Sequence, residues 1–255
     1  MNTIKPSIDN DGLHKCLETK INIHLNGLNK HNQSDNQKTL ELCQVGKFLC
    51  TYFPDYNIIE TREQPDFIIS NGSHAFGLEH QSIYKSEVLK RTGFYDNIAL
   101  LVEKEFEKDS DFPNFLVSCY LRNDIEFSNK DKRRILNTFI RVIREFVLND
   151  NFLENEIIDD IRKMNHSQKS VNVNFGGYMV PILEKEKLLE AIQKKERKID
   201  EYIKNTEKPQ WLLLLIGGVG AHSYRIRNDM NLEFETKFEK IFILEDFDNR
   251  LYELK

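Results

Sequence analysis

The apolar positions of the chain recur with two different spacings, which predict helices and strands in alternation. Helical spacing predicts helices over residues 39–53, 84–108 (with a break at Gly93), 130–148 and 183–204. Short apolar or alternating runs predict strands over residues 56–59, 66–69, 75–82, 114–121, 171–180 (interrupted at Gly176-Gly177) and 211–216. A terminal hairpin is expected over 240–254, turning near Asp248-Asn249. This alternation is typical of an α/β fold.

The run from Trp211 to Ile216 is apolar throughout, which predicts a central strand that is covered on both faces. We expect it to join the three strands between residues 56 and 82 in one mixed sheet. The helices over 39–53 and 183–204 should flank that sheet. On the first of them, Val45, Phe48, Leu49 and Tyr52 form the apolar stripe and Glu41 lies at its border.

The domain organisation follows from where polar and apolar segments fall. Residues 1–38 are polar and rich in asparagine, so they are expected to be peripheral, with a loop over 31–36. Residues 39–255 then form a single domain. Within it, residues 109–180 are expected to be an inserted α/β segment, although no linker rich in proline or glycine marks its ends.

Two acidic residues begin or interrupt neighbouring strands. Asp66 opens the run Pro65-Asp66-Phe67-Ile68-Ile69, and Glu79 lies in the next run, Phe76-Gly77-Leu78-Glu79-His80-Gln81. Asn71-Gly72 lies between the runs and favours a tight hairpin turn, which can bring the two carboxylates together. Because side chains alternate along a strand, Glu79 and Gln81 share one face and His80 points the other way. Two carboxylates and a backbone carbonyl suit a hard cation such as Mg²⁺.

These residues resemble the motif of the PD-(D/E)XK nuclease superfamily. Pro65-Asp66 matches its Pro-Asp, and Glu79-His80-Gln81 matches its acid-x-Lys, with Gln81 at the position where lysine is usual. The order of a helix, the motif strands, a further helix and an apolar strand is also the order of the family's core. The resemblance implies a restriction-endonuclease-like mixed sheet flanked by helices. It also implies Mg²⁺- or Mn²⁺-dependent hydrolysis of nucleic acid, as a DNA endonuclease of restriction or defence type.

The resemblance also assigns roles to single residues. Asp66, Glu79 and His80 are the metal-binding positions, and Gln81 with a helix-borne lysine organises the attacking water. Lys195 is the first choice for that lysine, because it falls inside the apolar arc of the helix over 183–204, and Lys198 is the second. A lysine in this arc is more typical of a side chain that packs beside Tyr202 and reaches solvent.

Glu41 matches a further acid that many relatives carry on the preceding helix, although a surface glutamate at a helix border is common. The His80 side chain, on the face opposite Glu79, is more typical of packing than of a base.

Composition and charge narrow the classes of function. The chain has 255 residues and a net charge of −5, which argues against nonspecific coating of nucleic acid. No apolar run is long enough for a membrane helix. The four cysteines show no metal-like or disulfide-dense spacing, which favours a reduced, cytoplasmic protein.

A basic stretch, Lys130–Arg134, continues with Arg141 and Arg144 on one helix face. This face is either solvated or in contact with phosphate. The expected partner is double-stranded DNA, no membrane partner is expected, and a homodimer is compatible with the sequence. The alternative function is a nuclease fold without activity that serves as a binding or regulatory module, because the motif lysine is missing and the net charge is acidic.

Overall fold

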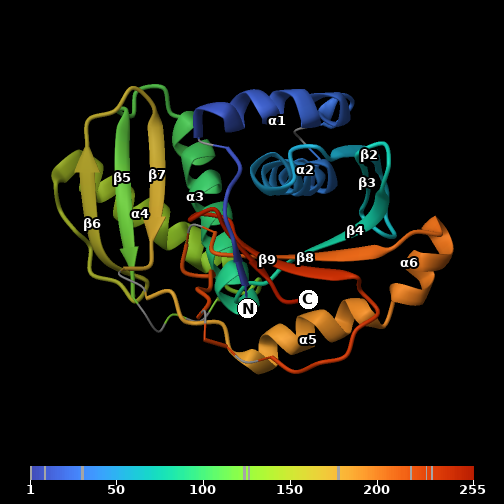
Figure 1. Ribbon diagram of the computed structural model, residues 1–255. Helices are drawn as coiled ribbons and strands as arrows, with labels where there is room; N and C mark the ends of the chain where they lie inside the picture. Colours follow the sequence, from blue (N-terminus) through green and yellow to red (C-terminus); the bar gives the residue numbers. More distant parts are fainter. Residues whose placement is uncertain are drawn as a thin grey trace. The chain divides into compact units, whose positions relative to one another are not determined.

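The chain divides into two compact units in the computed structural model (Figure 1). Unit 1 comprises Met1–Tyr84 and Val180–Lys255, and unit 2 comprises Lys85–Met179. The structure describes residues 2–8, 10–29, 32–122, 125, 127–176, 179–218, 220–227, 229–230 and 232–255, without the side chains of residues 10, 11 and 33. None of the described helices has the length and apolar character needed to cross a membrane.

Unit 1 is built on a seven-stranded mixed sheet. Its strand order is β1-β10-β9-β8-β4-β3-β2. The strands are β1 (Asn2–Ile4), β2 (Asn57–Thr61), β3 (Phe67–Ser70), β4 (Ala75–Ser82), β8 (Gln210–Ile216), β9 (Lys240–Glu245) and β10 (Arg250–Glu253). β8 runs parallel to both β4 and β9, whereas the other neighbours are antiparallel. The predicted joining of the three motif strands with β8 is confirmed.

Helices cover both faces of this sheet (Figure 1). α1 (Asn10–Leu25) and α2 (Gln33–Tyr52) lie on one face, and α5 (Lys185–Glu196) and α6 (Ile199–Thr206) lie on the other. Alternate residues of β8 enter the two cores: Leu213 packs in the cluster with α2, and Leu212 packs in the cluster with α5 and α6. Every residue of β8 is buried, as its apolar sequence predicts. The predicted apolar stripe of α2 is also buried.

The N-terminal segment is part of unit 1, so the prediction of a peripheral segment is wrong. Leu17, Ile21 and Leu25 recur at four-residue spacing on α1 and pack in the α2 cluster, a stripe that the surrounding polar residues obscure. The expected loop over 31–36 is also wrong, because α2 already begins at Gln33; residue 31 lies outside the described residues. The Asn32 side chain accepts a hydrogen bond from the Ser34 backbone N–H, which explains this early start.

A disulfide links α1 to α2 through Cys16 and Cys50. This bond was not expected from the cysteine spacing, because the two residues are 34 positions apart and the pairing depends on how the helices pack. Cys43 and Cys119 are free thiols. The cytoplasmic location stays a prediction.

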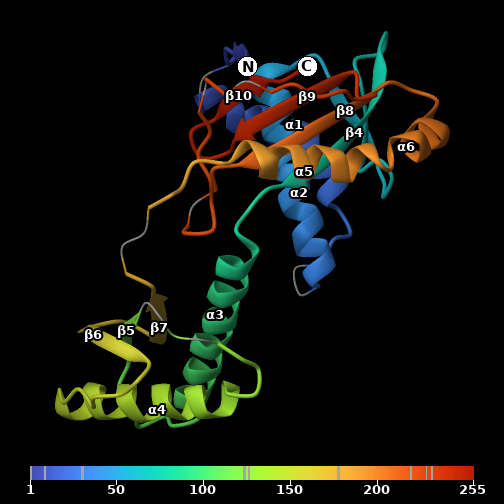
Figure 2. The same ribbon diagram turned by 90° about the horizontal axis from the view of Figure 1, so that it is seen from below.

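Unit 2 is a three-stranded sheet with two helices. Its elements are α3 (Ser86–Glu107), β5 (Phe115–Leu121), α4 (Lys132–Asn149), β6 (Ile158–Met164) and β7 (Lys169–Asn174), with strand order β6-β5-β7. Figure 2 shows α3 and α4 beside the strands, and buried side chains of both helices share one core with β5. The unit begins at Lys85 rather than at residue 109, so α3 belongs to it. α3 also continues through Gly93, where a break was predicted.

Two strand predictions in unit 2 need correction. β6 was missed because its sequence, IDDIRKM, carries four charged residues and has no regular alternation. A register shift near Tyr120 and Leu121 explains the pattern, since a bulge places both Ile158 and Ile161 toward the core although they are three residues apart. β7 begins at Lys169 and ends at Asn174, earlier than the predicted strand over 171–180; Gly177 lies outside the described residues.

The basic face of α4 is largely engaged with acidic neighbours or exposed to solvent. Arg134 pairs with Glu156, and Arg144 lies 3.6 Å from Asp109. Arg141 is exposed. These ion pairs are at the surface and account for the arginines without a ligand. Contact of this face with phosphate stays a prediction.

Candidate metal centre

The hairpin of β3 and β4 brings Asp66 and Glu79 together. Phe67, the first residue of β3, pairs with Leu78, and Asp66 and Glu79 are the next residues beyond this pair on the two chain segments. The His80 backbone N–H donates a hydrogen bond of 2.8 Å to Asp66 Oδ2, which fixes this carboxylate against β4. The two acids therefore lie close enough for the charge of Glu79 to act on Asp66, where the pairing of β3 with β4 ends.

Local sequence accounts for this register. Gly72 has a φ of +90°, a conformation that glycine adopts readily, and the Asn71 side chain accepts hydrogen bonds from the backbone N–H groups of Ser73 and His74. The turn predicted at Asn71-Gly72 thus closes the hairpin. Gly77 on β4 permits a close approach, since a Cβ there would lie 2.3 Å from Gln210 Oε1 on β8.

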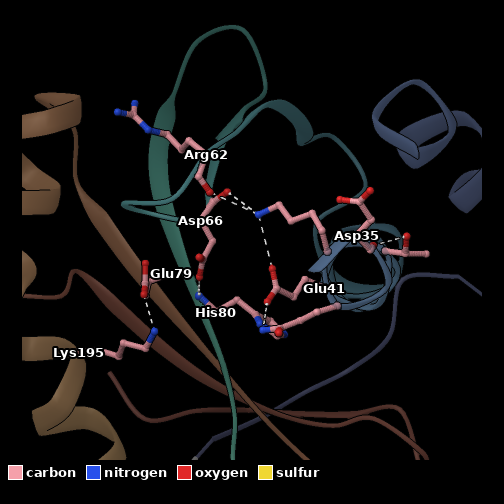
Figure 3. Close-up of polar contacts among 10 residues, drawn as sticks. Asp35, Glu41, Arg62, Asp66, Glu79, His80 and Lys195 are labelled. Carbon is pink, nitrogen blue, oxygen red and sulfur yellow. Dashed lines mark hydrogen bonds and ion pairs between the residues drawn. The ribbon is translucent and has the colours of Figure 1, made fainter. Parts of the chain in front are cut away.

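Glu79 is buried and only one of its oxygens is bonded. Its Oε1 accepts hydrogen bonds from Lys195 Nζ at 2.5 Å and from Tyr202 Oη at 3.0 Å. Its Oε2 is also buried and has no hydrogen-bond partner within the described part of the chain. A buried carboxylate oxygen without a partner carries a large desolvation cost, so it calls for a cation or an ordered water. Figure 3 shows Lys195 approaching Glu79 on the side away from Glu41.

The two faces of β4 divide the motif residues as predicted. Glu79 turns toward α5 and α6, through Lys195 and Tyr202. Gln81 shares that face by alternation, and its Oε1 is buried without a partner among the described residues. Leu78 packs in the cluster with α2, so His80 lies on that face too. Glu79 and Gln81 thus each have a buried acceptor oxygen without a partner among the described residues, and both lie on the same face of β4.

The position of His80 limits its part in a metal site to its backbone. Its imidazole lies on the face opposite the Glu79 carboxylate, so only its backbone carbonyl can take part in a site that Glu79 forms. Burial, with smaller contributions from the charges of Lys195 and Lys38, lowers the pKa of His80 to about 3. The ring is therefore neutral at physiological pH, as suits the packing residue that was the other interpretation.

The pKa of Asp66 is shifted because its carboxylate is partly buried and the carboxylate of Glu79 lies close to it. Burial, followed by the negative charge of Glu79, raises the pKa of Asp66 to about 7. The hydrogen bond from the His80 N–H and the charge of Lys195 act in the opposite direction, and Glu41 adds a smaller upward effect. In the absence of a cation, Asp66 is therefore partly protonated at neutral pH. A bound divalent cation would favour its ionised form.

We expect Asp66 to contribute a loss of stability to the metal-free protein as the pH rises toward 7, and Asp66→Asn to remove this contribution. The folded pKa of Asp66, about 7, lies above its ordinary value of 3.8, so the folded protein binds more protons than the unfolded chain between these values. The stabilisation from this proton is complete below pH 3.8, the ordinary pKa of Asp66, and it is lost as the pH rises through the folded pKa of about 7. Its slope is at most about 1.4 kcal/mol per pH unit.

Urea unfolding in EDTA at about pH 5 and about pH 7 measures this effect as the difference between wild type and variant. His80 contributes a slope of opposite sign, because its lowered pKa gives stability that is lost as the pH falls through its ordinary value of 6.5. That contribution is common to both proteins and cancels in the difference. A pH-independent difference would show that the pKa of Asp66 is not raised.

Glu41 and Lys38 lie on α2, next to the segment that carries Asp66. Lys38 Nζ donates to the backbone carbonyls of Arg62 and Asp66, at 3.4 and 3.5 Å, and pairs with Glu41 at 3.5 Å. Glu41 Oε1 also accepts from Gln37 Nε2. The Glu41 carboxylate is thus engaged on α2 and acts on Asp66 through its charge. Lys38 was not predicted from the sequence; it supports the backbone at Asp66, and no periodicity distinguished it.

Of the two candidate lysines, the structure brings Lys195 into contact with Glu79. Lys195 lies in the last turn of α5 and reaches Glu79, with a side chain that is 17% exposed. Lys198 is the N-cap of α6 and is exposed. The predicted helix over 183–204 is in fact two helices with a turn at Arg197 and Lys198. Tyr202, which the sequence placed on the same arc as Lys195, is the second donor to Glu79.

The arrangement suits a cation that retains several waters. No group of three or more histidine, cysteine, aspartate or glutamate side chains is positioned to hold a metal within the described ranges. Asp66, Glu79 and a backbone carbonyl would leave coordination positions open, which is how Mg²⁺ is usually bound beside substrate phosphates. Comparison of the chain with family models, with curated proteins and with solved structures finds no match.

Proposed function

We propose that unit 1 is the core of a divalent-metal-dependent endonuclease with a restriction-endonuclease-like fold, acting on double-stranded DNA. The observation that carries the proposal is the unbonded, buried Oε2 of Glu79 in a site shared with Asp66 and Lys195. A buried carboxylate oxygen of this kind is suited to bind a cation. The lysine next to it provides the positive charge that Gln81 cannot provide.

The order of elements around the site supports the same conclusion. Helix α2 precedes the antiparallel strands β2, β3 and β4, and helix α5 precedes β8, which pairs in parallel with β4. This succession agrees with the core implied by the resemblance to the PD-(D/E)XK superfamily. Asp66 directly precedes β3, and Glu79 and Gln81 lie on β4, the strand next to β8.

Each residue has a distinct task in this proposal. Asp66 Oδ1 and Glu79 Oε2 would hold Mg²⁺ or Mn²⁺, with the carbonyl of His80 as a further oxygen. The bound ion would polarise the phosphate and make water a stronger nucleophile. Lys195 presents a fixed positive charge to the phosphate, and the Gln81 amide orients a water by hydrogen bonding without taking its proton.

The alternative is a nuclease fold that only binds a partner. Unlike the proposed endonuclease, it would not need a cation. A protein that only binds a partner has no need for two neighbouring acids, Asp66 and Glu79, of which the second keeps a buried oxygen without a partner among the described residues. The missing strand lysine was the main sequence argument for this alternative. Lys195 at 2.5 Å from Glu79 weakens that argument, because the positive charge is present on a neighbouring helix instead.

Incubation with DNA tests the proposal directly. We expect the purified protein to cleave supercoiled plasmid or linear double-stranded DNA in Mg²⁺ or Mn²⁺ and not in EDTA, and calorimetry to detect binding of Mn²⁺ without DNA. Cleavage of RNA alone would change the substrate but keep the chemistry. Absence of both metal binding and cleavage would favour the binding module.

A further inference from the structure

The two hydrogen bonds to Glu79 converge on the same oxygen. Lys195 Nζ and Tyr202 Oη both donate to Oε1, and Oε2 has no partner within the described residues. A carboxylate that is held by one oxygen has its other oxygen fixed in direction as well. Oε2 is therefore preorganised, and its direction depends on the donors to Oε1.

Tyr202 is well suited to hold this carboxylate. It lies on α6, its side chain is almost fully buried, and its ring packs in the apolar cluster with Leu212 and Leu214 of β8. Its hydroxyl donates to Glu79 Oε1 at 3.0 Å. A rigid aromatic side chain with one hydrogen-bonding group loses little freedom in this role.

We propose that Tyr202 is a positioning residue that orients Glu79 by holding its Oε1, so that Oε2 faces the divalent cation. This inference rests on the proposed function, and it gives Tyr202 and Lys195 different tasks. An ammonium group has three donors and a flexible stem, so Lys195 can turn one donor toward a substrate phosphate. The Tyr202 hydroxyl keeps Glu79 in place while Lys195 contacts the phosphate.

Replacement of Tyr202 by phenylalanine tests the inference, because it removes only the hydroxyl. Tyr252→Phe is the matched control: Tyr252 is also buried in unit 1, and its hydroxyl donates to Glu245 Oε2 at 3.0 Å. Both variants lose one buried hydrogen bond between a tyrosine and a glutamate. Only Tyr202→Phe should weaken Mn²⁺ binding, by about 10- to 100-fold, the usual loss when an outer partner of a metal ligand is removed.

Mn²⁺ affinity is measured by isothermal titration calorimetry on the intact chain, together with the urea midpoint of each variant. Unchanged affinity in Tyr202→Phe, or an equal loss in both variants, would overturn the inference. Asp66→Ala distinguishes this outcome from failure of the proposed function. If Asp66→Ala binds no Mn²⁺ while Tyr202→Phe binds normally, only the role of Tyr202 is wrong; if Asp66→Ala binds normally, the metal centre itself is wrong.

Discussion

Alanine at Asp66 or at Glu79 should abolish metal-dependent cleavage of DNA. Each replacement removes one of the two neighbouring carboxylates, of which Asp66 directly precedes β3 and Glu79 lies on β4. A bound metal ion contributes several kcal/mol of charge stabilisation in hydrolysis, and each ~1.4 kcal/mol is a tenfold change in rate. The loss of the ion therefore corresponds to about 10³-fold or more, below the background of a gel assay.

The two variants should differ in stability although both are inactive. Asp66→Ala relieves the repulsion between the half-buried Asp66 and the buried Glu79, but it also leaves the His80 N–H without its acceptor. The two effects oppose each other, so the metal-free variant should unfold close to the urea concentration of wild type. Glu79→Ala leaves Lys195, which is 17% exposed, without its partner. Removing one member of a buried pair costs about 3–5 kcal/mol, and the partial exposure of Lys195 reduces that figure. Glu79→Gln keeps an acceptor for Lys195 and Tyr202 and is the milder test.

A nearby acid provides the control for this prediction. Glu63 lies three residues before Asp66 and is exposed. Glu63→Ala should cleave DNA as well as wild type does, because a solvated carboxylate contributes little to the site. The rate of plasmid nicking in Mg²⁺ measures all these variants. Full activity in Asp66→Ala or in Glu79→Ala would contradict the assignment of the metal centre.

Those parts of the fold that depend on local pattern could be predicted from the sequence. The apolar run of β8 specified a strand buried on both faces, and the Asn71-Gly72 turn specified the hairpin that brings Asp66 close to Glu79. Alternation along β4 also separated Glu79 from His80 correctly. In each case a short segment contains all the information, because the period of a strand fixes which side chains share a face.

Features that depend on tertiary contacts were not predictable. No glycine or proline marks the turn at Arg197 and Lys198, so a continuous helix was the natural expectation. The convergence of Lys195 and Tyr202 on one oxygen requires the packing of α5 and α6 against β4, which no spacing reveals. β6 escaped notice because a bulge changed its period, and the Cys16–Cys50 disulfide because it follows the packing of α1 on α2.

Lys195→Met should reduce the rate of cleavage by about 10²- to 10³-fold, the typical loss when one fixed stabiliser of transition-state charge is removed. Methionine keeps an apolar stem of similar length, and Tyr202 still donates to Glu79 Oε1. In the presence of Mg²⁺ we therefore expect a small change in stability. Single-turnover cleavage at saturating enzyme separates this effect on the chemical step from weaker DNA binding.

Neighbouring lysines make this prediction specific. Lys194 precedes Lys195 on α5 and is exposed, and Lys198 is exposed at the start of α6. Lys194→Met and Lys198→Met should both retain the wild-type rate. A large loss in Lys198→Met with none in Lys195→Met would reverse the assignment. Equal, small losses in all three would mean that these lysines act only through general attraction to DNA.

The position of Gln81 allows a stronger version of the same test. Gln81 shares its face of β4 with Glu79. It is at the position where the PD-(D/E)XK motif, which this segment resembles, usually has lysine. If the requirement is a positive charge next to Glu79, then Gln81→Lys should restore much of the cleavage that Lys195→Met removes. If the requirement is specifically the ion pair between Lys195 and Glu79, the double variant should stay as slow as Lys195→Met. Recovery would show that a positive charge beside Glu79 is sufficient, whether β4 or α5 carries it.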